Sequence, residues 1–138
     1  MTTDVFTAAR SSRLAMRSIG AVVAGFATVA VLSIVADGAL RAAGLYPDEA
    51  AASLQDGLFA LALGYRALFG VAAGYVAGKL APHRPLMHAA ILGGIGTVLS
   101  IGGAVALWEA GPHWYAIGVA LACIPTALFG ARLARPAR

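Results

Sequence analysis

The sequence predicts an all-α membrane protein, an antiparallel bundle of four transmembrane helices that leaves both termini in the cytoplasm. Three observations predict this fold: an apolar composition, four long apolar runs, and a one-sided distribution of basic residues. Of the 138 residues, 60% are hydrophobic and only 12% are charged, and the mean hydropathy is +0.82. A water-soluble domain of this length carries more polar surface. The composition therefore favours a chain surrounded by lipid.

The apolar runs divide a single transmembrane domain, residues 1–138, into four spans. Each run is close to the roughly 20 residues with which an α-helix crosses a bilayer. The expected spans cover residues 19–40, 58–80, 86–108 and 113–133, and a basic arm at 1–18 precedes them. We expect the arm to form a short helix on the membrane surface. The first run exceeds the roughly 7–15 residues of a signal-peptide core, so a true span is expected there.

The connections between the runs are short and rich in residues that end helices. The first contains Gly44, Pro47, Asp48, Glu49 and Asp56. Two prolines flank a basic pair in residues 81–85, and residues 109–112 close the third span with Gly-Pro. Short connections place consecutive helices side by side in opposite directions. They leave little room for a soluble domain between spans.

The basic residues indicate the orientation of the spans. In a four-span arrangement, eight of them fall on one side: Arg10, Arg13, Arg17, Lys79, Arg84, Arg132, Arg135 and Arg138. The other side has Arg41 with four acidic residues, Asp48, Glu49, Asp56 and Glu109, and four interfacial aromatics, Tyr46, Trp108, Trp114 and Tyr115. The positive-inside rule places the basic side in the cytoplasm. Basic residues at span ends also argue against nucleic-acid binding, and Lys79 and Arg84 are expected to contact lipid headgroups.

Small residues line one face of the second span. Gly70, Gly74 and Gly78 recur every four residues, so they share that face. Close packing between helices in lipid relies on such small residues. Two interpretations stay open: the face holds the four helices together within one chain, or it is an interface with a partner or a second copy.

Arg66 is the charged residue that needs an explanation. It lies about nine residues into the second span, roughly 13 Å along a helix axis, where a charge is costly and usually has a partner. Asp37, near the same end of the first span, is the expected partner. The pair is either a structural ion pair that sets the register of two helices or part of a cavity that binds an anion or relays protons. A third interpretation pairs Arg66 with a partner subunit or a lipid phosphate.

The sequence offers no arrangement typical of an enzyme or a metal protein. His83 and His88 lie at the opposite end of the spans from His113, and Cys123 stands alone in an apolar run. Serine and threonine residues inside the spans lack a histidine base at the same depth. We therefore predict no catalytic residues, no metal and no cofactor.

Several segments resemble those of small, uncharacterised four-span bacterial inner-membrane proteins. They are Tyr65-Arg66, GVAAGYVAGKLAPHRP at residues 70–85, Met87-His88-Ala89, Gly111-Pro112-His113-Trp114-Tyr115 and Ile124-Pro125. The resemblance covers most of the chain. It implies a location in the bacterial inner membrane, and it brings no activity, cofactor or site residues.

The expected function is that of a non-catalytic integral membrane protein. We expect an accessory or assembly subunit of a larger bacterial membrane complex, with the lipid bilayer and other membrane subunits or a second copy as partners. The alternative is a small oligomeric transporter or channel that uses Arg66 and Asp37.

Overall fold

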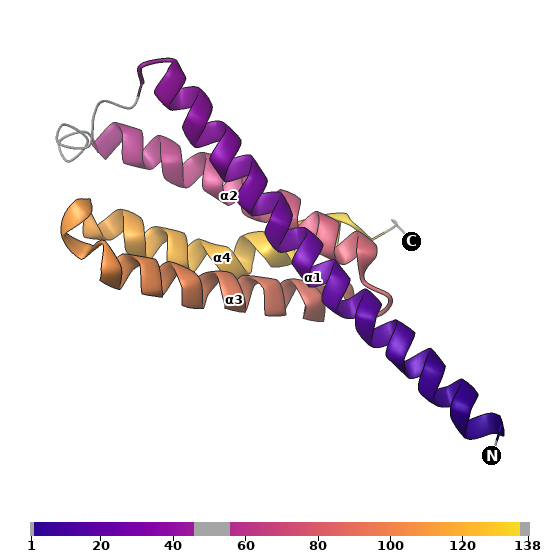
Figure 1. The fold of residues 1–138 in the computed structure, drawn as a ribbon. Helices are drawn as coiled ribbons and strands as arrows, with labels where there is room; N and C mark the ends of the chain where they lie inside the picture. The colour runs from indigo at the N-terminus through magenta and orange to yellow at the C-terminus, as the bar shows by residue number, and fades with distance from the viewer. Residues whose placement is uncertain (1, 46–55, 136–138) are drawn as a thin grey trace.

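All regular secondary structure in the described residues is helical. The computed structural model describes residues 2–45 and 56–135, so Tyr46, Asp48, Glu49 and Arg138 lie outside it. The elements are α1 (Thr2–Ala42), α2 (Asp56–Leu80), α3 (Pro85–Ala106), the 3-10 helix η2 (Trp108–Ala110) and α4 (His113–Leu133) (Figure 1). Four helices are long and apolar enough to cross a membrane. The expected all-α class and the four candidate spans are therefore confirmed.

The first helix differs from the expectation of a separate surface arm. Residues of the basic arm and of the first apolar run form one continuous α1 of 41 residues. At the rise of an α-helix this is about 60 Å, roughly twice the thickness of the hydrocarbon core. Neither proline nor glycine occurs between Thr2 and Gly20 to interrupt the helix. The N-terminal half of α1 therefore projects past the other helices (Figure 1).

The tightest contact joins α2 to α4. A Cβ atom added at Gly74 would overlap the carbonyl oxygen of Ala127, and one added at Gly130 would overlap the carbonyl oxygen of Val71. At Gly78 the same atom would lie 3.0 Å from the Cα of Ala131. The two backbones approach closely along this line because each contact places a glycine of one helix against the backbone of the other.

The remaining helices pack on this pair by the same means. A Cβ atom at Gly93 of α3 would lie 2.8 Å from the Cα of Ile124 in α4, and one at Gly25 of α1 would lie 2.9 Å from the carbonyl oxygen of Ala73 in α2. Among the described residues, every buried apolar side chain except Leu92 is an alanine. The bundle is thus held by backbone proximity, and large apolar side chains face outward.

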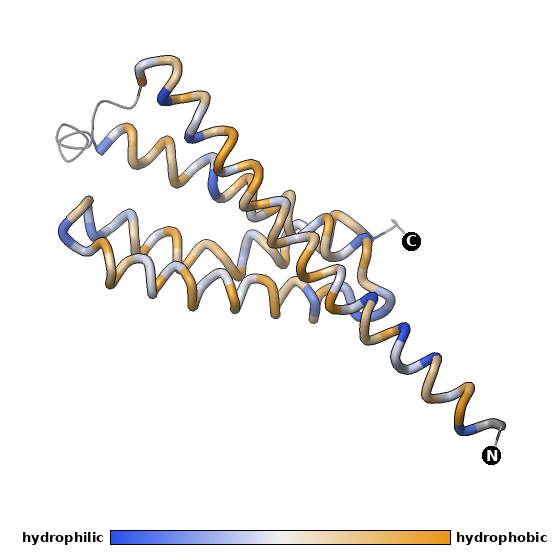
Figure 2. Tube along the Cα trace, in the orientation of Figure 1, coloured by the Kyte–Doolittle hydropathy of each residue, from blue (hydrophilic) through white to orange (hydrophobic). Residues whose placement is uncertain are grey.

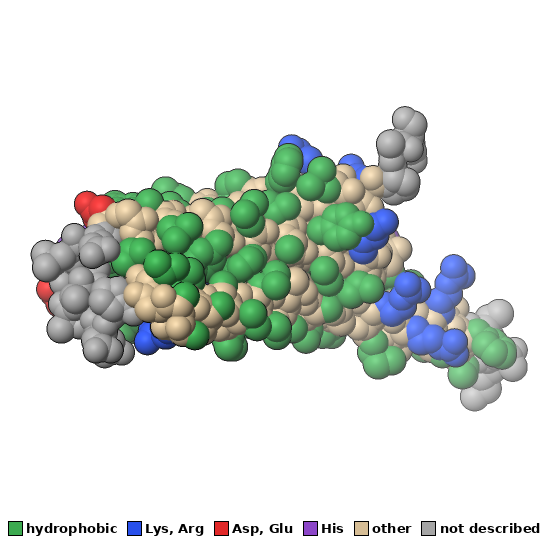
Figure 3. Space-filling model, turned by 90° about the horizontal axis from the view of Figure 1, so that it is seen from above, with side chains coloured by type: hydrophobic (Ala, Val, Ile, Leu, Met, Phe, Trp, Pro, Cys, Tyr) green, Lys and Arg blue, Asp and Glu red, His purple; other side chains and the backbone are tan. Residues whose placement is uncertain are grey.

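Charged side chains separate along the bundle. Figure 2 shows apolar residues over most of each helix, and Figure 3 shows most Lys and Arg side chains gathered at one end and Asp and Glu at the other. We call the first the basic end. It carries Lys79 and Arg132, near the ends of α2 and α4, and Arg84, just before α3 begins. The acidic end carries Asp56 and Glu109, where α2 begins and η2 follows α3.

Candidate functional site

The structure brings Asp37 of α1 and Arg66 of α2 together. The Nη2 atom of Arg66 donates a hydrogen bond to Oδ2 of Asp37 over 2.9 Å, and the hydroxyl of Tyr65 donates to Oδ1. About a third of each charged side chain is exposed, 35% for Arg66 and 34% for Asp37. Both carboxylate oxygens therefore have a donor, as predicted for a charge placed inside a span.

The guanidinium of Arg66 is less completely satisfied than its partner. An arginine has five N–H donors. Its Nε atom is buried and has no hydrogen-bond partner among the described residues. A buried donor without an acceptor costs free energy. A further acceptor that reaches the exposed part of the guanidinium would add a hydrogen bond and stabilise the site.

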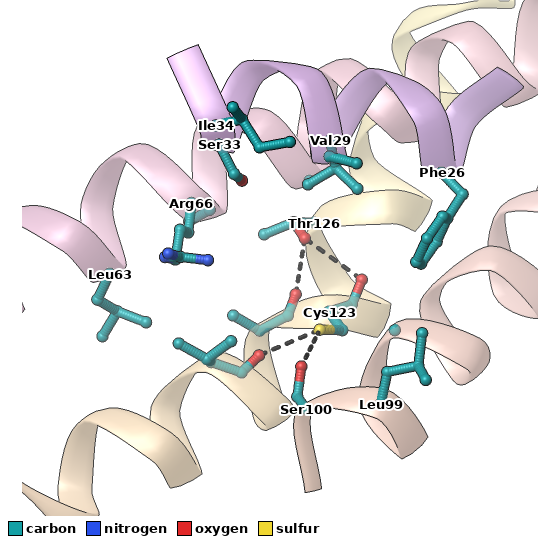
Figure 4. Close-up of a pocket in the computed structure, with 16 residues that line it drawn as sticks. Phe26, Val29, Ser33, Ile34, Leu63, Arg66, Leu99, Ser100, Cys123 and Thr126 are labelled. Atoms are coloured by element: carbon teal, nitrogen blue, oxygen red, sulfur yellow. Dashed lines mark hydrogen bonds between the residues drawn. The ribbon is translucent and has the colours of Figure 1, made fainter. Parts of the chain in front are cut away.

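Arg66 lines a cavity of about 420 Å³ between the four helices. Figure 4 shows the labelled side chains converging on it: Phe26, Val29, Ser33 and Ile34 from α1, Leu63 and Arg66 from α2, Leu99 and Ser100 from α3, and Cys123 and Thr126 from α4. Most of these groups are apolar. Among the described residues that line this cavity, Arg66 is the only charged one.

A second cavity of about 330 Å³ adjoins the first toward the acidic end. Arg66, Ser100 and Val119 line both cavities, so the guanidinium stands at their junction. Aromatic rings form much of the second wall: Phe59, Trp108, His113 and Tyr115. The rings of Trp108 and His113 stack with centroids 3.8 Å apart, and those of Phe59 and Tyr115 tilt at 5.2 Å.

Polar side chains of α3 and α4 meet beside the larger cavity, whose wall includes Ser100 and Cys123. The hydroxyl of Ser100 and the Sγ of Cys123 are 3.6 Å apart. Thr97 donates to the carbonyl oxygen of Gly93 over 2.9 Å and lies 3.2 Å from that of Ala120 across the helix pair. Sequence reasoning did not connect these residues with Arg66. The spacing of Thr97 and Ser100 on one helix face was the available signal.

The other predicted residues, with the exception of Gly70, lie away from this cavity. Gly74 and Gly78 face α4 of the same chain, and Gly70 both lines the cavity and abuts Thr126. At the basic end, the Lys79 ammonium lies 5.7 Å from the Tyr75 ring centroid. Arg84 occupies the turn between α2 and α3 with a left-handed backbone, φ 44°.

The histidines do not form a metal centre. His88 is buried, and its Nδ1 lies 3.1 Å from the carbonyl oxygen of Arg84, so it closes the turn at the start of α3. Its ring is 5.7 Å from that of His83. Within residues 2–45 and 56–135, no group of three His, Cys, Asp or Glu side chains is placed to hold a metal ion.

At the acidic end, Trp114 ties α4 to α2. Its indole Nε1 donates to Oδ1 of Asp56 over 3.2 Å. This contact holds the start of both helices beside the second cavity.

Comparison with protein-family models, with curated proteins and with solved structures finds no match to this chain. The class defined by fold and site is a four-helix protein with candidate membrane spans and an arginine at a cavity junction.

Proposed function

We propose that the chain is a multi-pass protein of the bacterial inner membrane, an antiparallel bundle of four transmembrane helices with both termini in the cytoplasm. The separation of basic and acidic ends supports this orientation. Its function in this proposal is non-catalytic: an accessory or assembly subunit that binds other subunits of a larger membrane complex or a second copy.

One observation carries the accessory role: the projecting half of α1 has uncovered apolar side chains. Val5 is 67% exposed, Phe6 is 74% exposed and Met16 is also exposed. Arg10 and Arg13 on the same segment are exposed too. Apolar side chains on a helix that leaves the bundle gain stability only when a partner or a membrane surface covers them. The basic residues suit an acidic partner surface at the cytoplasmic side.

Purification from the native membrane in mild detergent tests this role. We expect the full chain to bring a larger assembly with it. The double substitution Val5→Ser with Phe6→Ser should release the partner, because it removes the exposed apolar surface. The matched control is Ala8→Ser with Ala9→Ser, two exposed alanines of the same helix segment. Equal recovery of partners with both double variants, or no partner with the unmodified chain, would refute the accessory role.

The cavity pair favours a second candidate, a small oligomeric transporter or channel. Arg66 stands where the two cavities meet and pairs with Asp37, an arrangement suited to binding an anion or relaying a proton. Proteoliposomes loaded with a chloride- or pH-sensitive dye test it. We expect flux that Arg66→Ala abolishes and that Arg41→Ala, a change at an exposed residue of α1, leaves intact. Absence of flux with the unmodified protein would refute this candidate.

A further inference from the structure

We propose that the cavities at Arg66 bind a single-chain amphiphile with an anionic head group, such as a fatty acid. The head lies at the Arg66 guanidinium, and the acyl chain occupies the larger cavity. This inference goes beyond the accessory role. It uses the same site as the second candidate function, the cavities at Arg66, but it does not require that the protein transports anything.

The larger cavity has the chemistry of an acyl-chain site. Its volume of about 420 Å³ lies within the range of small-molecule sites, about 300–1,000 Å³. Away from Arg66, two polar side chains of its wall on α4 use their hydrogens within that helix. The hydroxyl of Thr126 donates to the carbonyl oxygen of Ala122 over 2.7 Å, and the thiol of Cys123 donates to that of Val119 over 3.2 Å. The wall therefore offers mainly apolar contact to a ligand.

The head-group end has donors to spare. Asp37 accepts one hydrogen bond from the Nη2 atom of Arg66 and one from Tyr65, and 35% of the Arg66 side chain stays exposed. An arginine has five N–H donors, so this one bond to Asp37 does not exhaust the guanidinium. The planar guanidinium matches a carboxylate or phosphate in geometry. The hydroxyl of Ser100 lies on the wall of both cavities beside the same junction. An anionic head placed there meets the charged group and a hydroxyl together.

A small inorganic anion fits this site less well. Asp37 offsets part of the charge of Arg66, and a free anion must lose its water to enter the site. An acyl chain adds favourable contact with the apolar wall. The affinity is therefore expected to depend on both parts of the ligand: the chain in the larger cavity and the charge at the junction.

The arrangement also fixes the direction of the ligand. Along α2 the larger cavity runs from Leu63 and Arg66 to Gly70, toward the basic end. The second cavity, with His113 and the aromatic rings, adjoins Arg66 on the side of the acidic end. The head group thus lies on the side of the second cavity, and the chain points toward the tight contact of α2 with α4.

Photolabelling of the full chain in phosphatidylcholine nanodiscs tests the inference. The probe is palmitate carrying a diazirine on its chain, and labelled peptides are identified by mass spectrometry. We expect labels within residues 26–34 of α1 and 119–126 of α4, the segments that contribute side chains to the larger cavity. Unlabelled palmitate should compete, hexadecanol should require at least a tenfold higher concentration, and acetate should not compete. Equal competition by hexadecanol, or competition by acetate, would overturn the proposal.

Two variants test the two halves of the site. Arg66→Gln removes the charge, and Ala30→Leu fills part of the larger cavity from α1. Each should reduce labelling of the cavity peptides at least tenfold, whereas Arg41→Gln, exposed on α1, should not. Circular dichroism checks that each variant folds. If Arg66→Gln does not fold, Ala30→Leu and the competition series decide, and labelling of Ala30→Leu at the level of the unmodified chain overturns the proposal.

These outcomes are separable from those of the transport candidate. Labelling is measured without any gradient, so a chain that binds palmitate and shows no chloride or proton flux supports the amphiphile site and refutes the transporter. Flux without head-group-dependent labelling supports the transporter and refutes the amphiphile site. Neither measurement depends on the exposed residues of the projecting part of α1.

Discussion

Substitution of Gly74 by alanine should destabilise the bundle, because the added methyl group has no space. Its Cβ would overlap the carbonyl oxygen of Ala127 and lie 2.7 Å from the Cα of the same residue. Both atoms belong to the backbone, so relief requires α2 and α4 to separate. Overpacking of this kind costs about 1–3 kcal/mol. Gly74→Leu, with three more carbon atoms, should exceed this cost and separate the two helices.

The matched control is Gly64→Ala in the same helix. A Cβ at Gly64 meets no atom within 4 Å, and replacing glycine by alanine in a helix stabilises it by about 0.5–1 kcal/mol. The two alanine variants thus make the same chemical change with opposite expected signs. Their free energies of unfolding should differ by about 1.5–4 kcal/mol.

Reversible unfolding in mixed micelles, followed by circular dichroism with increasing SDS, measures this difference. The reasoning is refuted if Gly74→Ala is as stable as Gly64→Ala. The same result would show that α4 does not lie against this face. Size-exclusion chromatography of Gly74→Leu reports separately whether its loss of stability is accompanied by a change in assembly.

Three further predictions use the same preparations. Asp37→Asn and Arg66→Gln should each lower the free energy of unfolding by about 1–3 kcal/mol. The double variant should lose less stability than the sum of the two single variants, and strict additivity would argue against the ion pair. Gly93→Ala should destabilise the bundle by about 1–3 kcal/mol, because its Cβ would lie 2.8 Å from the Cα of Ile124. Gly94→Ala should not destabilise it, because a Cβ there meets no atom within 4 Å. Equal unfolding curves for the two variants would contradict the α3–α4 contact. Tags at the two termini should react only from the cytoplasmic side of the membrane, and labelling from opposite sides would contradict the four-span topology.

The spans were predictable because their length and composition depend only on the solvent. Twenty apolar residues cross a bilayer whatever their neighbours. The juxtaposition of Asp37 with Arg66 followed from similar arithmetic, since both lie near the same end of consecutive spans. The continuity of α1 differs from the prediction of a separate arm at residues 1–18, because the basic residues there do not end the helix. A change of polarity does not end a helix that contains neither proline nor glycine at that point.

The partners of the small-residue faces were not predictable in the same way. Every span has small residues at helical spacing, so the sequence could not assign Gly74 to Ala127 or Gly130 to Val71. That choice depends on how four surfaces fit together simultaneously. The cavities were also beyond the sequence, because an unfilled space results from side chains of all four helices.

The glycine contact and the cavities are two consequences of one helix crossing. Along α2, the residues toward the acidic end, Leu63 and Arg66, line open space, whereas Gly74 and Gly78 touch the backbone of α4. A ligand can therefore occupy the site at Arg66 with the helices as they stand. Passage through the bundle would require α2 and α4 to part at Gly74, against the closest packing in the structure. The geometry consequently makes binding at Arg66 the simpler of the two activities, and transport the one that demands a second conformation.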